Sequence, residues 1–201
     1  MKFKFLLIFG IITLILLSGC SEPQNQDSKL CSNEKGYTTE YSKSNNYISL
    51  TSESQLKLRA KLNETPGNLS EISDLICLEE LHVNNQEIRT EYLTPILKLK
   101  NLKHLDLSNT KVEDLTQLTE LTKLESLDLD DTRVSNLEPI TQLLELKTLS
   151  ISHTQILELA ILKNMANYGD MTILITKDTQ EECDYIFREY AETPNILCVT
   201  N

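Results

Sequence analysis

The chain has 201 residues, of which 40% are hydrophobic and 5% aromatic, with 19 Lys and Arg against 30 Asp and Glu. The resulting net charge of −11 argues against nucleic acid as a partner, because phosphate binding needs a basic face. Gly and Pro number only 5 each, which excludes collagen-like and low-complexity chains, and the length predicts one domain with a short appendage.

The first twenty residues, MKFKFLLIFGIITLILLSGC, have the features of a secretory signal. Lys2 and Lys4 precede an apolar run, 5–17, that is shorter than the roughly 20 residues of a membrane span. The ending LSGC resembles the bacterial lipobox, which implies cleavage after residue 19 and acylation of Cys20. Several acyl chains together hold a protein stably on a membrane. The alternative is an ordinary signal peptide followed by a chance cysteine.

Residue 21 bears on the location of the protein. It is Ser rather than Asp, a pattern that resembles lipoproteins sorted to the outer membrane of Gram-negative bacteria, so we expect a lipid-anchored protein of the cell envelope there. In a Gram-positive cell the same signal would mean the outer face of the plasma membrane. Removal of residues 1–19 takes away two lysines and no acid, so the mature chain carries −13.

Four cysteines remain once Cys20 is set aside, and an even number in an exported chain predicts two disulfides. We favour the pairs Cys31–Cys77 and Cys183–Cys198, since each pair lies at one end of the folded region. The alternative is four free, buried thiols. No CxxC motif supports a zinc ribbon or a thioredoxin-type site.

The segment after the anchor, 21–46, is mostly polar and predicts a tether. Ordered structure is expected from Tyr47, with a short strand or capping segment followed by a helix over 53–63 that ends before Thr65-Pro66-Gly67.

A period of 22 residues then dominates the chain. Three units with the pattern LxxLxLxxTx(V/I) start at Leu102, Leu124 and Leu146. An earlier copy begins at Leu78, 24 residues before the first, and a degenerate copy is expected with Met171, Ile173 and Thr176 in the same register. Alternation within each unit predicts a short strand, and the apolar spacing of three that follows predicts a returning arm that is 3₁₀-like or a short helix.

The repeats resemble the leucine-rich repeat family, with Thr where Asn is commoner, and residues 54–88 are similar to the capping segments of internalin-like bacterial proteins. A Thr hydroxyl can also bond backbone groups in the turn. The resemblance implies an α/β solenoid, a right-handed superhelix with short parallel strands on its concave face and helical N-terminal and C-terminal caps. We therefore divide the chain into a signal peptide, an acylated tether, an N-terminal cap, the repeats and a C-terminal cap, at 1–19, 20–46, 47–77, 78–176 and 177–201. The last cap is expected to contain a helix over Thr179–Tyr190 and a strand over Ile196–Val199.

The side chains opposite the core should form three columns on the concave face. These columns are Glu80, His104, Ser126, Thr148; then His82, Asp106, Asp128, Ser150; and Asn84, Ser108, Asp130, Ser152. They favour a protein partner with a basic or polar surface, although solvated positions that only keep the solenoid soluble would have the same composition. A metal site built from His82, His104, Asp106 and Asp128 is a third, less favoured interpretation, so we expect no metal.

Nothing in the sequence predicts catalysis. The motifs GxSxG, HExxH, GxxxxGK[ST] and GxGxxG are absent, and carboxylates on an open face should lack the burial that shifts a pKa. We expect a non-enzymatic protein without a cofactor that mediates protein binding in the bacterial envelope. The alternative is an immunity or inhibitor lipoprotein that neutralises a toxin or hydrolase in the periplasm, because acidity steers a protein toward a basic enzyme.

Overall fold

The computed structural model of the chain describes residues 31–42, 47–156, 159, 161–162, 171–175 and 196–200. The expected signal segment, Cys20, Cys183 and the helix expected over Thr179–Tyr190 lie outside these residues. No helix within the described ranges is both long and apolar enough to cross a membrane.

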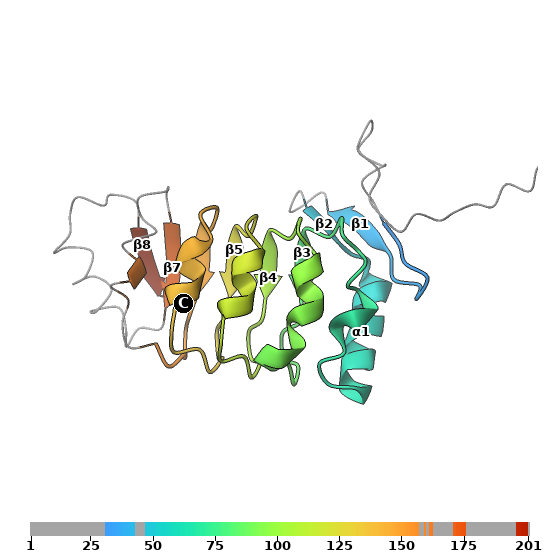
Figure 1. The fold of residues 1–201 in the computed structure, drawn as a ribbon, viewed down its shortest axis with the longest axis horizontal. Coiled ribbons are helices and arrows are strands. Elements are labelled where there is room, and N and C mark those ends of the chain that lie inside the picture. The colour runs from blue at the N-terminus through green and yellow to red at the C-terminus, as the bar shows by residue number, and fades with distance from the viewer. Residues whose placement is uncertain are drawn as a thin grey trace, which may run out of the picture.

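A parallel six-stranded sheet forms one side of the molecule. The strands follow one another in chain order and appear as a row in Figure 1. They are β3 (Glu80–His82), β4 (His104–Asp106), β5 (Ser126–Asp128), β6 (Thr148–Ser150), β7 (Met171–Ile175) and β8 (Ile196–Thr200). Each repeat therefore contributes one short strand, as the alternation of leucines predicts.

Short 3₁₀ helices run on the other side of the core, in front of the strands in Figure 1. They are η2 (Leu69–Glu71), η3 (Thr90–Tyr92), η4 (Thr94–Lys98), η5 (Thr116–Glu120) and η6 (Glu138–Gln142). Their form follows from the apolar spacing of three, because the 3₁₀ helix has three residues per turn and places such residues on one side. Of the two predicted forms of the returning arm, 3₁₀-like or short helical, the structure has the first.

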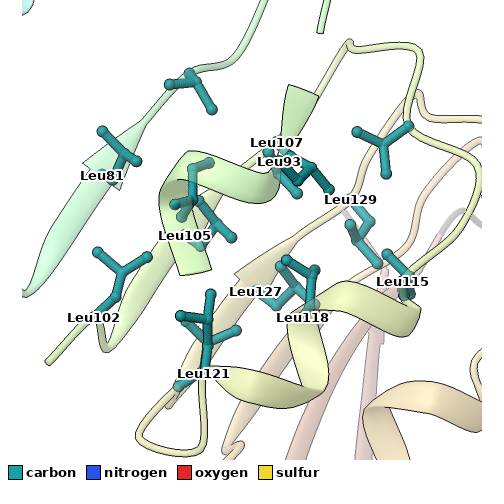
Figure 2. Close-up of a cluster of buried hydrophobic side chains, with 14 of the residues drawn as sticks. Leu81, Leu93, Leu102, Leu105, Leu107, Leu115, Leu118, Leu121, Leu127 and Leu129 are labelled. Atoms are coloured by element: carbon teal, nitrogen blue, oxygen red, sulfur yellow. The ribbon is translucent and has the colours of Figure 1, made fainter. Parts of the chain in front are cut away.

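The core between these two layers is a stack of leucines. Leu105, Leu127 and Leu149 lie opposite one another on neighbouring strands, and each is at most 2% exposed. Figure 2 shows that Leu118 and Leu121 from the returning arm point toward the strand leucines. Since one repeat cannot bury its own apolar side, each depends on its neighbour for a complete core.

The turns after β4, β5 and β6 are each closed by a threonine. The hydroxyl groups of Thr110, Thr132 and Thr154 donate to the carbonyl oxygens three residues earlier at 2.6–2.8 Å. The preceding residues in these turns are Asn109, Asp131 and His153, with φ of 52–54°, the left-handed region that Asn and Asp tolerate better than most residues. The prediction that Thr can take over the role of Asn in the turn is confirmed.

The structure differs from the expected tether at residues 31–42. Strand β1 (Thr39–Ser42) pairs antiparallel with β2 (Tyr47–Leu50), and Tyr37 is 1% exposed. Cys31 forms the favoured disulfide with Cys77, their Cα atoms 6.2 Å apart. Ordered structure thus begins well before Tyr47, because the disulfide and one buried aromatic ring compensate for the polar composition.

Helix α1 (Ser52–Glu64) packs at the N-terminal end of the repeats (Figure 1). Thr51 caps the helix by accepting a hydrogen bond from the Ser54 backbone N–H. Leu58 and Leu62 are buried in the same apolar cluster as the repeat leucines. The helix expected over 53–63 is therefore confirmed.

The register expected for the last repeat is wrong by two residues. Leu149 pairs with Ile173, which is fully buried, whereas the 22-residue period would have paired it with Met171. A shift of two keeps the same residues facing inward, so the sheet accommodates a 24-residue unit without turning a side chain to the other face. The final strand expected over Ile196–Val199 is present as β8.

Candidate functional site

The candidate site is the face of the sheet opposite the leucine core, called here the polar sheet face. Strand pairing places Glu80, His104, Ser126 and Thr148 in one row, and His82, Asp106, Asp128 and Ser150 in the next. Beyond the strands, the backbone N–H groups of Asn85, Asn109 and Asp131 donate to the carbonyl oxygens of Ser108, Asp130 and Ser152. These backbone hydrogen bonds continue the pairing just past the strand ends, where the third predicted column lies: Asn84, Ser108, Asp130 and Ser152. The structure thus brings the three predicted columns together on one face.

His82 and Asp106 form an ion pair at the N-terminal part of this face. Nδ1 of His82 lies 3.2 Å from Oδ2 of Asp106, and its Nε2 lies 3.3 Å from Oε1 of Glu80. The hydrogen bond to Asp106 raises the pKa of His82, against the opposing effect of burial and with help from Glu80. Burial alone would raise the pKa of Asp106, but hydrogen bonds from His82 and Ser108 outweigh it and leave the pKa lowered.

Asp128 lies directly beside Asp106 and has a different environment. Its carboxylate accepts a hydrogen bond from the Asp130 backbone N–H at 3.0 Å, and among the described residues no Lys or Arg forms an ion pair with it. Burial raises the pKa of Asp128 to about 6, and the charges of Asp130 and Asp106 add to this rise. The expectation that this face lacks the burial to shift a pKa is therefore wrong.

His104 is less accessible than a position on an open face would be. The ring of Tyr47, on β2, lies over it with the ring centroids 3.8 Å apart, and the buried Nε2 of His104 has no hydrogen-bond partner among the described residues. Burial is the main cause of its lowered pKa. The sequence does not predict Tyr47 as a neighbour of His104, because nothing in the repeat pattern indicates where the N-terminal hairpin docks.

The C-terminal part of the polar sheet face is also more enclosed than expected. Ser150 and Ser152 are each only 4% exposed. Asp130 Oδ1 accepts hydrogen bonds from the Ser150 hydroxyl and from the Ser152 backbone N–H, both at 2.7 Å. Within the described part of the chain, no group forms a hydrogen bond with the buried hydroxyl of Ser152.

Helix α1 borders the face at its other end. Nη2 of Arg59 donates to Oδ1 of Asn84 at 2.9 Å, and Nε2 of Gln55 donates to the carbonyl oxygen of His82 at 2.6 Å. Neither residue was among the predicted site residues, and the helical pattern of 53–63 gives no signal for these contacts. His153, the remaining histidine, has an exposed side chain 3.5 Å from Asp131.

The chemistry available on this face is hydrogen bonding and ion pairing. Within the part of the chain that the structure describes, no group of three His, Cys, Asp or Glu side chains is placed to hold a metal ion. The carboxylates and hydroxyls are mainly acceptors, which suits a ligand that supplies donors or positive charge.

The parallel sheet, the 3₁₀ arms and the shared leucine core define a leucine-rich repeat fold. Solved structures agree. An internalin C2 from Listeria monocytogenes matches with a TM-score of 0.53 at 22% identity, over 68% of this chain and 57% of that one. A second internalin of that organism (inlF) matches with a TM-score of 0.51 at 20% identity, over 66% of this chain and 37% of that one.

A leucine-rich repeat protein from Leptospira interrogans has a TM-score of 0.48 at 21% identity, over 66% of this chain and 33% of that one. The chain thus spans little more than half the length of the internalin C2 structure and about a third of the other two. No family model and no curated protein sequence matches the chain.

Proposed function

We propose that this protein is an exported, lipid-anchored leucine-rich repeat protein that binds another protein through the polar sheet face and catalyses no reaction. In this proposal the repeats form a right-handed superhelix with the polar sheet face on its concave side. The hairpin and α1 close one end of the core, and the C-terminal segment closes the other. Cys20 carries the lipid, and the outer membrane of a Gram-negative cell is the favoured location.

The observation that carries the binding function is the composition of the polar sheet face. Eight of its twelve residues lie in register across four strands, where they alternate with buried leucines, and the other four follow the strand ends. None of the twelve has an aliphatic side chain. Neighbouring strands are about 4.8 Å apart, so the face offers closely spaced acceptors on a rigid support. A partner with a basic or polar surface meets such a face without a large loss of hydration.

Two further features support export and anchoring. The Cys31–Cys77 disulfide is typical of proteins that fold in oxidising compartments, such as the bacterial periplasm. The sequence LSGC at 17–20 follows an apolar run of signal length. Replacement of Cys20 by Ser is expected to abolish acylation and to move the protein from the membrane fraction to the soluble fraction of the cell.

Site-specific photo-crosslinking in the native cell tests the binding function. We would place benzoylphenylalanine at Ser126, in the first row of the polar sheet face, and at Glu138, on the exposed side of η6, as the matched control. The expected result is a discrete crosslinked partner from position 126 and none from position 138. Equal capture from both positions, or capture from position 138 alone, would contradict the proposal.

The second candidate is an immunity or inhibitor lipoprotein, which the net charge of −11 favours because electrostatic steering speeds association with a basic enzyme. Protease treatment of intact cells separates the two candidates. An adaptor or adhesin on the cell surface is digested, whereas a periplasmic inhibitor is protected until the outer membrane is opened. The purified protein should also inhibit the captured partner only in the second case.

A further inference from the structure

The side of the repeats at which the strands begin, called here the strand-entry edge, consists of residues 76–79, 98–103, 120–125 and 142–147. One position of the repeat, two residues before its first leucine, is occupied in turn by Ile76, Lys100, Thr122 and Leu144. Side chains link neighbouring repeats here. Nδ2 of Asn101 donates to the carbonyl oxygen of Ile76, and Nζ of Lys123 donates to Oδ1 of Asn101, both at 2.8 Å. The edge is therefore one continuous surface.

Two large apolar side chains are exposed on the strand-entry edge. Leu144 is 52% exposed and Ile76 is 38% exposed, at the same repeat position and three repeats apart. Neighbouring strands are about 4.8 Å apart, so roughly 15 Å separates the two positions. Among the described residues the other exposed large apolar side chain is Leu56, on α1. Two of these three side chains thus lie on one edge.

The same edge carries most of the positive charge of the repeats. Of the charged residues in 68–156, five of the eight Lys and Arg but only four of the sixteen Asp and Glu belong to it. The five cations are Lys98, Lys100, Lys103, Lys123 and Lys147. The rest of that range has three cations against twelve acids. An anionic surface is therefore repelled by the other sides of the repeats and tolerated best at this edge.

The strand-entry edge is also hollowed between two repeats. The hollow has a volume of about 460 Å³, and its lining includes Lys103, Lys123 and Leu144. Lys103 pairs with Glu79, whereas Lys123 donates to an amide oxygen rather than to a carboxylate. An ammonium group beside an exposed leucine suits the headgroup region of a bilayer, where phosphates lie next to acyl chains.

The attachment point of the N-terminal segment is on this edge as well. Cys77 belongs to it and is bonded to Cys31, and only residues 21–30 separate Cys31 from Cys20. A lipid on Cys20 therefore holds the N-terminal end of the edge near the bilayer. Because the anchor makes the contact intramolecular, a weak surface attraction is enough to orient the protein.

We propose that the strand-entry edge rests on the surface of an anionic phospholipid bilayer, with Leu144 at the interface and the lysines beside the headgroup phosphates. This inference rests on the proposed lipid anchor and adds the orientation of the anchored protein. The strands then run away from the bilayer, and the polar sheet face stands free of it and open to a partner.

Tryptophan fluorescence tests the orientation, because the chain contains no Trp. Leu144→Trp introduces one fluorophore on the edge. Leu56→Trp is the matched control, since Leu56 is 70% exposed and follows Gln55, which contacts the carbonyl oxygen of His82 at the far end of β3. The acylated full-length protein is placed in vesicles of phosphatidylethanolamine and phosphatidylglycerol with brominated acyl chains. Quenching should be at least about threefold stronger in Leu144→Trp than in Leu56→Trp.

A charge variant in the Leu144→Trp background tests the role of the lysines. Lys123→Gln should lower the ratio of docked to undocked protein on the order of fivefold, and vesicles of phosphatidylcholine alone should weaken the quenching too. Lys111→Gln removes the same charge after the other end of β4, where Lys111 pairs with Glu87, and should leave the quenching unchanged.

Equal quenching in Leu144→Trp and Leu56→Trp would overturn the proposal, as would no quenching in either, or equal effects of Lys123→Gln and Lys111→Gln. If the protein still floats with the vesicles in these cases, the orientation fails and the lipid anchor stands. A mature protein with an unmodified Cys20 would instead refute the anchor and, with it, the orientation that rests on the anchor.

Discussion

The two faces of the sheet are made by the same strands and differ in every other respect. On the inner face Leu105, Leu127 and Leu149 repeat one side chain in register. On the outer face the corresponding row changes from Asp106 to Asp128 to Ser150, and Asp128 is a half-buried carboxylate that no Lys or Arg of the described residues pairs with. The inner face thus stabilises the fold. The outer face contains a carboxylate whose partial burial lowers the stability of the folded state, and such groups are typical of surfaces used for binding.

The largest effect is expected from Leu127→Ala on the inner face. The side chain is 1% exposed between two other leucines, so its truncation should cost about 3–4 kcal/mol of unfolding free energy. Urea denaturation measures the loss. Leu144→Ala is the control, because this side chain is 52% exposed and should cost less than about 1 kcal/mol. Similar losses for the two variants would show that the inner face does not carry the stability.

The second-largest loss of stability is expected at the N-terminal end of the core, where the Cys31–Cys77 disulfide links the hairpin of β1 and β2 to the start of the repeats. Replacing both cysteines by Ser should cost about 2–4 kcal/mol, because the crosslink restricts the unfolded chain over 46 residues. Hydrogen exchange should then show faster exchange in β1 and β2 and unchanged protection at Leu105 and Leu127. Uniform loss of protection would mean that the end and the centre of the core unfold as one unit.

On the outer face, Asp128→Asn is expected to stabilise the protein. The folded-state pKa of about 6 exceeds the ordinary value of 3.8, so the folded state binds more protons between these values and its stability falls as the pH rises through them. The variant lacks this penalty and should gain about 1–2 kcal/mol at pH 7.5 after allowance for solvent screening, and nothing near pH 3. Thermal melts at both pH values measure the difference. A loss of stability at neutral pH would show that the Asp128 charge is compensated.

The smallest effect is expected from His82→Gln. The pKa of His82 is raised by its hydrogen bond to Asp106, so its stabilising contribution is complete below the unfolded value of 6.5 and is lost as the pH rises through the folded value. Because the side chain is 46% exposed, the contribution should stay below about 1 kcal/mol. The variant should therefore melt earlier than the wild type at about pH 5.5 and at nearly the same temperature at about pH 9.

Much of the repeat region could be predicted from the sequence because its constraints are local. A strand with period two, an arm with spacing three and a repeat of 22 residues fix which side chains face inward, and Leu105, Leu127 and Leu149 follow the prediction. The same register fixes which residues share a row on the polar sheet face. These features depend on neighbouring residues in the chain rather than on distant contacts.

The missed features depend on contacts between distant parts of the chain. Tyr37 is buried within a polar segment, and the ring of Tyr47 covers His104 from another element. Leu149 pairs with Ile173, two residues later than the 22-residue period predicts. The strand register follows from which side chain is buried in the core and not from a constant repeat length. The raised pKa of Asp128 depends on how closely the neighbouring side chains enclose it, which the register alone does not give.

The disulfide at Cys31 has a consequence for how far the protein can extend from the bilayer. Eleven peptide steps separate Cys20 from Cys31, and a fully extended chain of that length reaches about 40 Å. A fully extended tether from Cys20 to Tyr47 would reach about 95 Å. With Cys20 acylated as proposed, the bond between Cys31 and Cys77 more than halves this reach, so any partner has to be met close to the lipid surface.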